Sequence, residues 1–249
     1  EQSTQVRLSA VPTVRGVDIA IRDQGEGLPF FWGHGLVSSM EQEDRFLVMS
    51  WARLARRYRV IRWDARGHGL SSGAPVPDDY RWDNLGRDLI ALADSLGIDQ
   101  FVAGGASMGA ATALHAASQA PRRVMALVLM LAPTAYETRD EQADLYRAAA
   151  VLVERLGMEA YLQQLSNLPA PGILADFSDR FSPVPQVSEQ LLPSVLRGAA
   201  SSDLPPQEVV RRVTALEAAC YGYNRAERSF FAAIRNADGR WHEVPGHGR

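Results

Sequence analysis

Residues 101–110 read FVAGGASMGA and place Ser107 between two glycines, as G-A-S-M-G at residues 105–109. The pattern G-x-S-x-G is typical of a sharp turn between a β-strand and an α-helix, with a strained serine whose hydroxyl is exposed above a sheet. Glycines flank the serine because the turn leaves no room for a Cβ there. The stretch therefore predicts a strand over residues 101–103, a helix over residues 108–119 and an exposed serine hydroxyl between them.

Strand-like and helical stretches alternate on both sides of this turn. Strictly alternating or continuous apolar patterns predict strands, and apolar residues at helical spacing predict helices. Asp83 is expected to be the N-cap of one helix, and Gly97 follows the end of the same helix. The expected strands cover residues 17–22, 30–32, 58–63 and 124–131, and the expected helices residues 44–57 and 83–96. This alternation indicates an α/β fold with a mostly parallel sheet and helices on both faces.

The pattern changes after residue 135. Residues 136–206 contain helical stretches interrupted by prolines, expected at residues 140–156, 158–167 and 189–196, without any strand-like run. Sheet character returns weakly over residues 213–225, an Ala-rich stretch with little β-propensity. We therefore expect a core domain made of residues 1–135 and 207–249, with residues 136–206 inserted as a helical lid.

Composition excludes several classes of function. A hydrophobic fraction of 46% and a charged fraction of 22% describe an ordinary globular protein. The net charge of −3 does not favour a nucleic-acid or membrane partner. Cys220 is the only cysteine, so the chain has no internal disulfide. No dinucleotide or phosphate-binding glycine motif and no metal-ligand cluster appears, and we expect neither a cofactor nor a metal.

Three motifs together resemble those of the α/β-hydrolase superfamily. In chain order they are G-H-G-L at residues 33–36, D-A-R-G-H-G-L-S at residues 64–71, and the serine turn. The S-M-G form of the serine turn resembles the form found in small esterases, enol-lactonases, carbon–carbon bond hydrolases and cofactor-free haloperoxidases. The resemblance covers roughly residues 17–133 and implies the α/β-hydrolase fold.

The resemblance also implies a chemistry for the serine turn. Ser107 would attack an acyl carbonyl as the nucleophile. The backbone N–H groups of Leu36 and Met108 would stabilise the oxygen that gains negative charge, as an oxyanion hole does.

A serine nucleophile needs a base, and the chain has five histidines. His34 and His68 match loop positions that the family uses structurally, and His115 is expected to pack on the helix after Ser107. His242 is expected on a strand. His247 follows the last strand, where the family's base lies, although it stands two residues before the histidine of the family's P-G-x-G-H pattern.

The acid that would orient this histidine is less well defined. The family's strand pattern after the lid places Arg225 at the acidic position. The candidates that remain open are Glu227, Asn224, Glu217, Glu137 and Asp140.

Two functions follow from these residues. The first is a serine hydrolase that cleaves a small, fairly apolar carboxylic ester or lactone through an acyl-enzyme. The second is a hydrolase-fold protein that binds ligand with little turnover, because the acid and base positions are altered. The first ten residues lack the pattern of a signal peptide, so we expect a cytoplasmic protein, with a removed leader and the oligomeric state left open.

Overall fold

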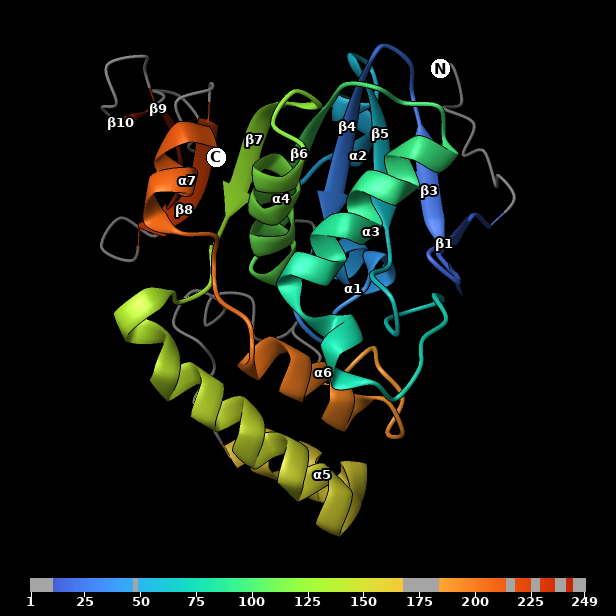
Figure 1. Ribbon diagram of the computed structural model, residues 1–249, viewed down its shortest axis with the longest axis vertical. Helices are drawn as coiled ribbons and strands as arrows, with labels where there is room; N and C mark the ends of the chain where they lie inside the picture. The colour runs from blue at the N-terminus through green and yellow to red at the C-terminus, as the bar shows by residue number, and fades with distance from the viewer. Residues whose placement is uncertain are drawn as a thin grey trace.

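A computed structural model describes residues 11–46, 49–167, 184–213, 218–224, 229–235 and 241–243. Its centre is an eight-stranded sheet with the order β10-β9-β8-β7-β6-β4-β5-β3, beside a separate hairpin β1-β2 (Figure 1). The strands are β1 Thr13–Val14, β2 Val17–Asp18, β3 Ile21–Gln24, β4 Leu28–Gly33, β5 Tyr58–Trp63, β6 Phe101–Ala106, β7 Val124–Met130, β8 Ala218–Asn224, β9 Ser229–Arg235 and β10 Trp241–Glu243.

The five central strands β5, β4, β6, β7 and β8 are parallel to one another. Strand β3 pairs antiparallel with β5 at one edge, and β9 pairs antiparallel with both β8 and β10 at the other. Because two reversals restore the original direction, β10 runs the same way as β8. Strands β6, β8 and β10 therefore all end at one edge of the sheet, which we call the carboxyl edge.

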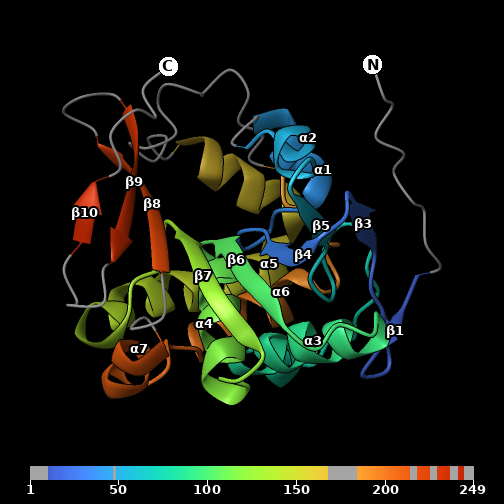
Figure 2. The ribbon, with the colours of Figure 1, turned by 90° about the horizontal axis from the view of Figure 1, so that it is seen from above.

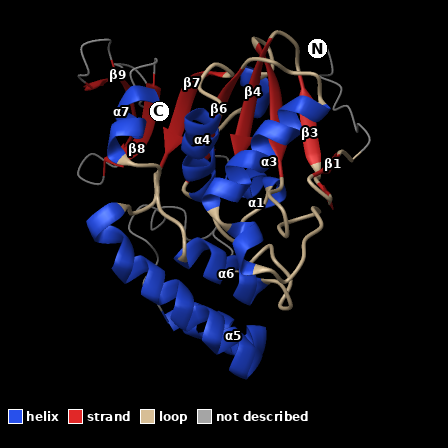
Figure 3. Cartoon of the chain, in the orientation of Figure 1, coloured by secondary structure: helices blue, strands red, loops and turns tan. Residues whose placement is uncertain are grey.

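Helices cover both faces of the sheet (Figures 2 and 3). Helices α1 and α2 lie on one face, whereas α3, α4 and α7 lie on the other (Figure 2). The helices are α1 Met40–Phe46, α2 Trp51–Leu54, α3 Trp82–Ser95, α4 Met108–Gln119, α5 Arg139–Asn167, α6 Leu192–Ala200 and α7 Gln207–Val213, with short 3-10 helices η1 Pro77–Tyr80 and η2 Tyr136–Thr138. The predicted mostly parallel sheet with helices on both faces is thus confirmed.

The main hydrophobic core lies between the sheet and helices α3 and α4, where Phe31, Leu85, Phe101 and Leu114 are fully or almost fully buried. Alanines at positions 110, 111 and 113 of α4 have no exposed surface, so this helix packs very closely on the sheet. Close packing fixes the position of the first turn of α4, which follows Ser107.

A second hydrophobic cluster lies at the carboxyl edge and joins α5 to α6. Its buried members include Ala150 and Val153 of α5 and Val195 and Leu196 of α6. Both helices lie beyond the carboxyl edge of the sheet (Figure 1). The expected division into a core and a lid over residues 136–206 stays a prediction.

The expected single helix over residues 44–57 is wrong, because two short helices, α1 and α2, occupy this region. Helix α1 begins four residues earlier than expected. The Ser39 hydroxyl accepts the Gln42 N–H at 3.1 Å, and the Asp64 carboxylate accepts the Met40 N–H at 2.7 Å. Because Asp64 is distant in sequence, apolar spacing alone could not reveal this start.

Asp83 is not the N-cap of α3, contrary to the expectation. The helix begins at Trp82, whose N–H donates to the Ser202 hydroxyl at 3.0 Å. Asp83 instead pairs with Arg81 and Arg87. Gly97 follows the helix at φ +66°, as expected of a residue that ends a helix.

Two other boundaries also differ. The strand expected at residues 17–22 is divided into β2 and β3, and the helix expected at residues 189–196 starts at Leu192. Glu189 has another role, because its carboxylate accepts the Met158 N–H at 3.0 Å, beside the break in α5 at Gly157. None of the described helices has the length and apolar character that crossing a membrane requires.

Candidate active site

Ser107 lies between β6 and α4, where the sequence predicts the sharp turn. Its backbone has φ 52° and ψ −110°, a conformation that costs about 1–3 kcal/mol for a residue with a side chain. The Ser107 N–H donates to the carbonyl oxygen of Met130 at 2.9 Å, at the end of β7. Its side chain is partly exposed. The strained turn therefore presents the hydroxyl at the carboxyl edge of the sheet.

Glycines allow the chain to approach itself around Ser107. A Cβ on Gly105 would lie 2.6 Å from the Gly33 carbonyl oxygen and 2.7 Å from the Gly109 Cα. A Cβ on Gly35 would lie 3.8 Å from the Ser107 Cβ, which is an ordinary van der Waals distance. The backbone of the G-H-G-L loop thus lies directly beside the serine.

The G-H-G-L loop continues into a turn over residues 35–38, which we call the oxyanion turn after the role expected of it from the sequence. The Ser38 N–H donates to the Gly35 carbonyl oxygen at 3.1 Å, and His34 Nδ1 lies 2.8 Å from the same oxygen. The Gly35 carbonyl and the Leu36 N–H belong to one planar peptide unit and point in opposite directions. Bonds that hold the carbonyl therefore also fix the direction of the Leu36 N–H.

Neither the Leu36 N–H nor the Met108 N–H donates a hydrogen bond within the part of the chain that the structure describes. Met108 is the first residue of α4, and its N–H is among those that a helix leaves without an internal partner. The positive end of the helix dipole adds to its attraction for an anion. Both N–H groups are thus able to donate hydrogen bonds to an oxygen atom that gains negative charge.

His34 is held in one tautomer by its two neighbours. The Ala65 N–H donates to its Nε2 at 3.0 Å, so Nδ1 carries the proton and donates to the Gly35 carbonyl. Burial lowers the pKa of His34 to about 4. The ring is therefore neutral near pH 7 and bridges the oxyanion turn to the loop at residues 64–71.

His68 is also buried, and its ring centroid lies 5.1 Å from that of His34. His68 Nδ1 lies 2.9 Å from the Arg66 carbonyl oxygen, and burial lowers the pKa of His68 to about 3. His115 is on α4, and its Nε2 lies 2.8 Å from the Asp203 carbonyl oxygen. In the described part of the chain, none of these three rings has a hydrogen bond with Ser107.

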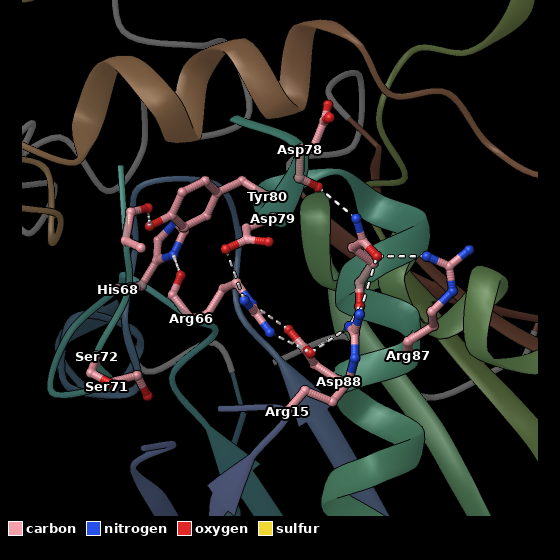
Figure 4. A network of polar contacts seen from close by, with 12 residues as sticks. Arg15, Arg66, His68, Ser71, Ser72, Asp78, Asp79, Tyr80, Arg87 and Asp88 are labelled. Carbon is pink, nitrogen blue, oxygen red and sulfur yellow. Dashed lines mark hydrogen bonds and ion pairs between the residues drawn. The ribbon is translucent and has the colours of Figure 1, made fainter. Parts of the chain in front are cut away.

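The loop at residues 64–71 supports the site through a buried ion-pair network (Figure 4). Arg66 binds Asp88 of α3 with two bonds, Nε to Oδ2 at 2.7 Å and Nη2 to Oδ1 at 2.8 Å. Arg15 also donates to Asp88, at 2.8 Å, and Arg66 lies 3.3 Å from Asp79. Tyr80 packs against the same loop, because a Cβ on Gly67 would lie 2.7 Å from its ring, and its hydroxyl donates to the Ala74 carbonyl at 2.7 Å.

The expected general base and two of the five candidates for the acid cannot be compared with this geometry. His247, Glu227 and Glu217 lie outside the described residues. Asn224 is the last residue of β8, at the carboxyl edge. Glu137 and Asp140 are exposed around the start of α5. The described residues thus bring together Ser107, Leu36 and Met108 from the predicted site.

Leu36 packs against both the main core and the second cluster. From α5 and α6, Tyr146, Leu152, Tyr161 and Val195 belong to that second cluster. An apolar surface thus continues from the oxyanion turn into the helices beyond the carboxyl edge. The described residues contain no group of three or more side chains suited to hold a metal ion.

Comparisons with known proteins agree with this fold. The family model described as alpha/beta hydrolase fold matches residues 33–149. Among curated proteins, 3-oxoadipate enol-lactonase 2 of Acinetobacter baylyi is 35% identical over 145 residues, which cover 58% of this chain and 49% of that protein. The 2-(acetamidomethylene)succinate hydrolase of Mesorhizobium japonicum is 26% identical over 76% of this chain and 69% of its own.

Solved structures show the same architecture. The enol-lactonase from Burkholderia xenovorans LB400 superimposes with a TM-score of 0.61 at 23% identity, covering 82% of this chain and 76% of that one. The match to the first curated relative spans about half of that relative's length. The three sequence motifs, the sheet order and these matches agree: the chain has the α/β-hydrolase fold, and its residues 33–149 match the α/β-hydrolase family model.

Proposed function

We propose that the protein is a serine hydrolase that cleaves a small, fairly apolar carboxylic ester or lactone through an acyl-enzyme. The observation that carries the proposal is the strained Ser107 turn, with two backbone N–H groups, of Leu36 and Met108, left without partners in the described part of the chain. Backbone strain of this kind is typical of functional sites.

The proposed reaction begins when the Ser107 oxygen attacks the ester carbonyl while a base removes the hydroxyl proton. The carbonyl oxygen becomes an oxyanion that accepts hydrogen bonds from the Leu36 and Met108 N–H groups. Collapse of the tetrahedral intermediate expels the alcohol, which takes the proton from the base. Water, activated by the same base, then hydrolyses the acyl-enzyme and restores Ser107. Loss of one oxyanion donor typically slows such a reaction by about 10²–10³-fold.

His247 is our candidate for the base, by comparison with the other four histidines. His34 has both ring nitrogens in hydrogen bonds, and His68 and His115 are tied to backbone carbonyls. His242 is within β10, whose end at Glu243 lies at the carboxyl edge. His247 follows four residues later in the sequence. The orienting acid stays open, with Glu227 as our first choice.

The substrate class draws on the relatives and on the apolar surface near the oxyanion turn. Two relatives are named for an enol-lactone and for 2-(acetamidomethylene)succinate, both small molecules. The apolar residues of α5 and α6 next to Leu36 would suit the apolar part of an ester. We also propose that residues 136–206 form a helical lid over the active site.

Hydrolysis of p-nitrophenyl acetate by the full chain tests the proposal. Wild type is expected to release p-nitrophenol, and Ser107→Ala is expected to lose all activity above background. His247→Ala should lose at least about 10³-fold in kcat if it is the base, whereas His242→Ala should retain activity. Ser118→Ala, on the other end of α4, is the matched control.

Release that continues in Ser107→Ala would contradict the serine mechanism. Saturable ligand binding without turnover in the wild type would instead favour the ligand-binding alternative. A large loss of kcat in His242→Ala but not in His247→Ala would indicate that His242, on β10, is the base.

A further inference from the structure

A short segment just before α6 contacts the oxyanion turn. It comprises residues 184–187, which we call the strap. The Gln186 N–H donates to the Val37 carbonyl at 2.7 Å, and the Gly69 N–H donates to the Gln186 carbonyl at 2.7 Å. One peptide segment thus links the oxyanion turn to the loop at residues 64–71. These elements are distant in sequence, so no local pattern indicates the contact.

The oxyanion turn needs support because Val37 has an unfavourable backbone conformation. Its φ is +56°, in the left-handed region that glycine adopts readily and a β-branched residue rarely does. Such a conformation costs about 1–2 kcal/mol for a residue with a Cβ. The hydrogen bond from Gln186 to the carbonyl of this same residue holds the strained turn in place.

Side chains add weaker links between the strap and the chain that follows the turn. Gln42 Nε2 donates to the Val184 carbonyl at 3.3 Å, and the Ser39 hydroxyl lies 3.5 Å from Gln186 Oε1. Within the strap, Gln186 Nε2 donates to the Val184 carbonyl at 3.2 Å. The main-chain bonds of Gln186 are shorter than these side-chain contacts and therefore carry most of the link.

The strap itself is firmly attached to the rest of the fold. Val187 is buried in the second hydrophobic cluster, and Pro185 is also buried. Helix α6, which follows, packs against η1 so closely that a Cβ on Gly198 would lie 2.6 Å from the Tyr80 Cβ. A segment fixed in this way can hold the turn in position.

We propose that Gln186 is a positioning residue, whose N–H holds the oxyanion turn so that the Leu36 N–H faces the reacting carbonyl. Leu36 immediately precedes Val37, so a shift of the Val37 carbonyl displaces the peptide that carries the donor. This inference rests on the proposed function, because it concerns the transition state of that reaction. It assigns a catalytic contribution to the region after α5, beyond covering the site.

The test compares two substitutions at one position in the full chain. Gln186→Pro removes the N–H and is expected to lower kcat by about 10–100-fold with little change in KM, because the oxyanion donor acts mainly in the transition state. Gln186→Ala keeps both main-chain bonds and loses only side-chain contacts, which corresponds to a loss of about threefold. A purely structural role would not separate kcat from KM in this way.

A second variant removes only the hydrogen bond. An α-hydroxy acid at position 186 replaces the amide by an ester, so it deletes the N–H without the ring of proline, which also restricts the preceding residue. The expected result is again a fall in kcat at nearly constant KM. Equal kcat in the ester variant and the wild type would overturn the proposal, whether or not the proline variant folds.

Val37→Gly supplies a third measurement. Glycine removes the strain at residue 37, so the turn depends less on the strap, and the ester at 186 should then cost less in kcat than it does beside Val37. An equal loss in both backgrounds would contradict the role of strain. If wild type has no Ser107-dependent activity, the proposed function fails; if that activity is present and the ester leaves it unchanged, only the role of Gln186 fails.

Discussion

The backbone of Gly109 in α4 touches the backbone of Gly33 at the end of β4. A Cβ on Gly109 would overlap the Gly33 carbonyl and lie 3.0 Å from the Gly33 Cα. Gly33 begins the G-H-G-L loop, and Gly109 follows Ser107 by two residues. This contact therefore brings the proposed nucleophile and the proposed oxyanion turn together.

Gly109→Ala is expected to destabilise the protein and to lower its activity. Helix propensity alone would make alanine more favourable than glycine by about 1 kcal/mol. The overlap with the Gly33 backbone outweighs this gain, and we expect a net loss of about 1–3 kcal/mol in the free energy of unfolding, measured with urea. A Gly109→Ala variant that is more stable than wild type would contradict the packing described.

Asp88→Asn is expected to cost about 3–5 kcal/mol of stability, because it leaves the buried Arg66 without the carboxylate that accepts two of its hydrogen bonds. The Asp88 side chain has no exposed surface. Asp83→Asn, which removes a partly exposed carboxylate on the same helix, should cost no more than about 1 kcal/mol. Similar losses in the two variants would show that burial does not set the strength of the Arg66 pair.

His34 is expected to make the folded protein sensitive to acid. Burial lowers its pKa from 6.5 to about 4, so below pH 6.5 the unfolded chain takes up a proton that the folded chain does not. The stability contributed by neutral His34 is present above pH 6.5 and is lost as the pH falls towards 4, by about 3 kcal/mol. His34→Gln removes this titration. The difference in unfolding free energy between wild type and variant should therefore shift with pH over this range, and a constant difference would contradict the assignment.

Glu43 is expected to give the opposite pH dependence. Burial raises its pKa from 4.5 to about 7, although Arg62 and Trp32 both favour its charged form. The folded protein then holds a proton that the unfolded chain releases, so stability is lost as the pH rises from 4.5 through 7, by about 3 kcal/mol. Glu43→Gln should accordingly gain stability relative to wild type over this range. A difference that does not change with pH would show that Glu43 is already ionised at pH 5.

Local sequence patterns predicted several elements closely, although β6, which enters the Ser107 turn, extends three residues beyond the expected strand at residues 101–103. Strand β5 and helix α4 have the expected bounds, because alternation, helical spacing and the glycines at 105 and 109 are all local signals. The starts of α1 and α3 were missed for a physical reason. Their first N–H groups bind Asp64 and Ser202, which come from distant parts of the chain, although Ser39, whose hydroxyl accepts the Gln42 N–H, is a local N-cap signal for α1.

The candidate site likewise combines contacts that the local sequence predicts with contacts that it does not. The pattern of residues 33–36 and 105–109 predicted which backbone groups meet, whereas the contact of Gln186 with Val37 depends on how the segment after α5 returns to the sheet. Strand β8 lies within the weakly sheet-like stretch at residues 213–225, and β10 contains His242, which was expected on a strand, whereas the antiparallel pairing of β9 with both was not predicted. His247 and Glu227 lie outside the described residues, so their roles stay predictions.

Labelling with a fluorophosphonate tests the central claim most directly, because the reagent reacts with an activated serine and leaves a stable adduct. The labelled residue is identified by peptide mass spectrometry, and urea unfolding of Ser107→Ala establishes that the variant is folded. We predict that wild type carries one label, on Ser107, and that folded Ser107→Ala carries none. A label on another residue, or labelling of Ser107→Ala at the wild-type rate, would contradict the assignment of Ser107 as the nucleophile.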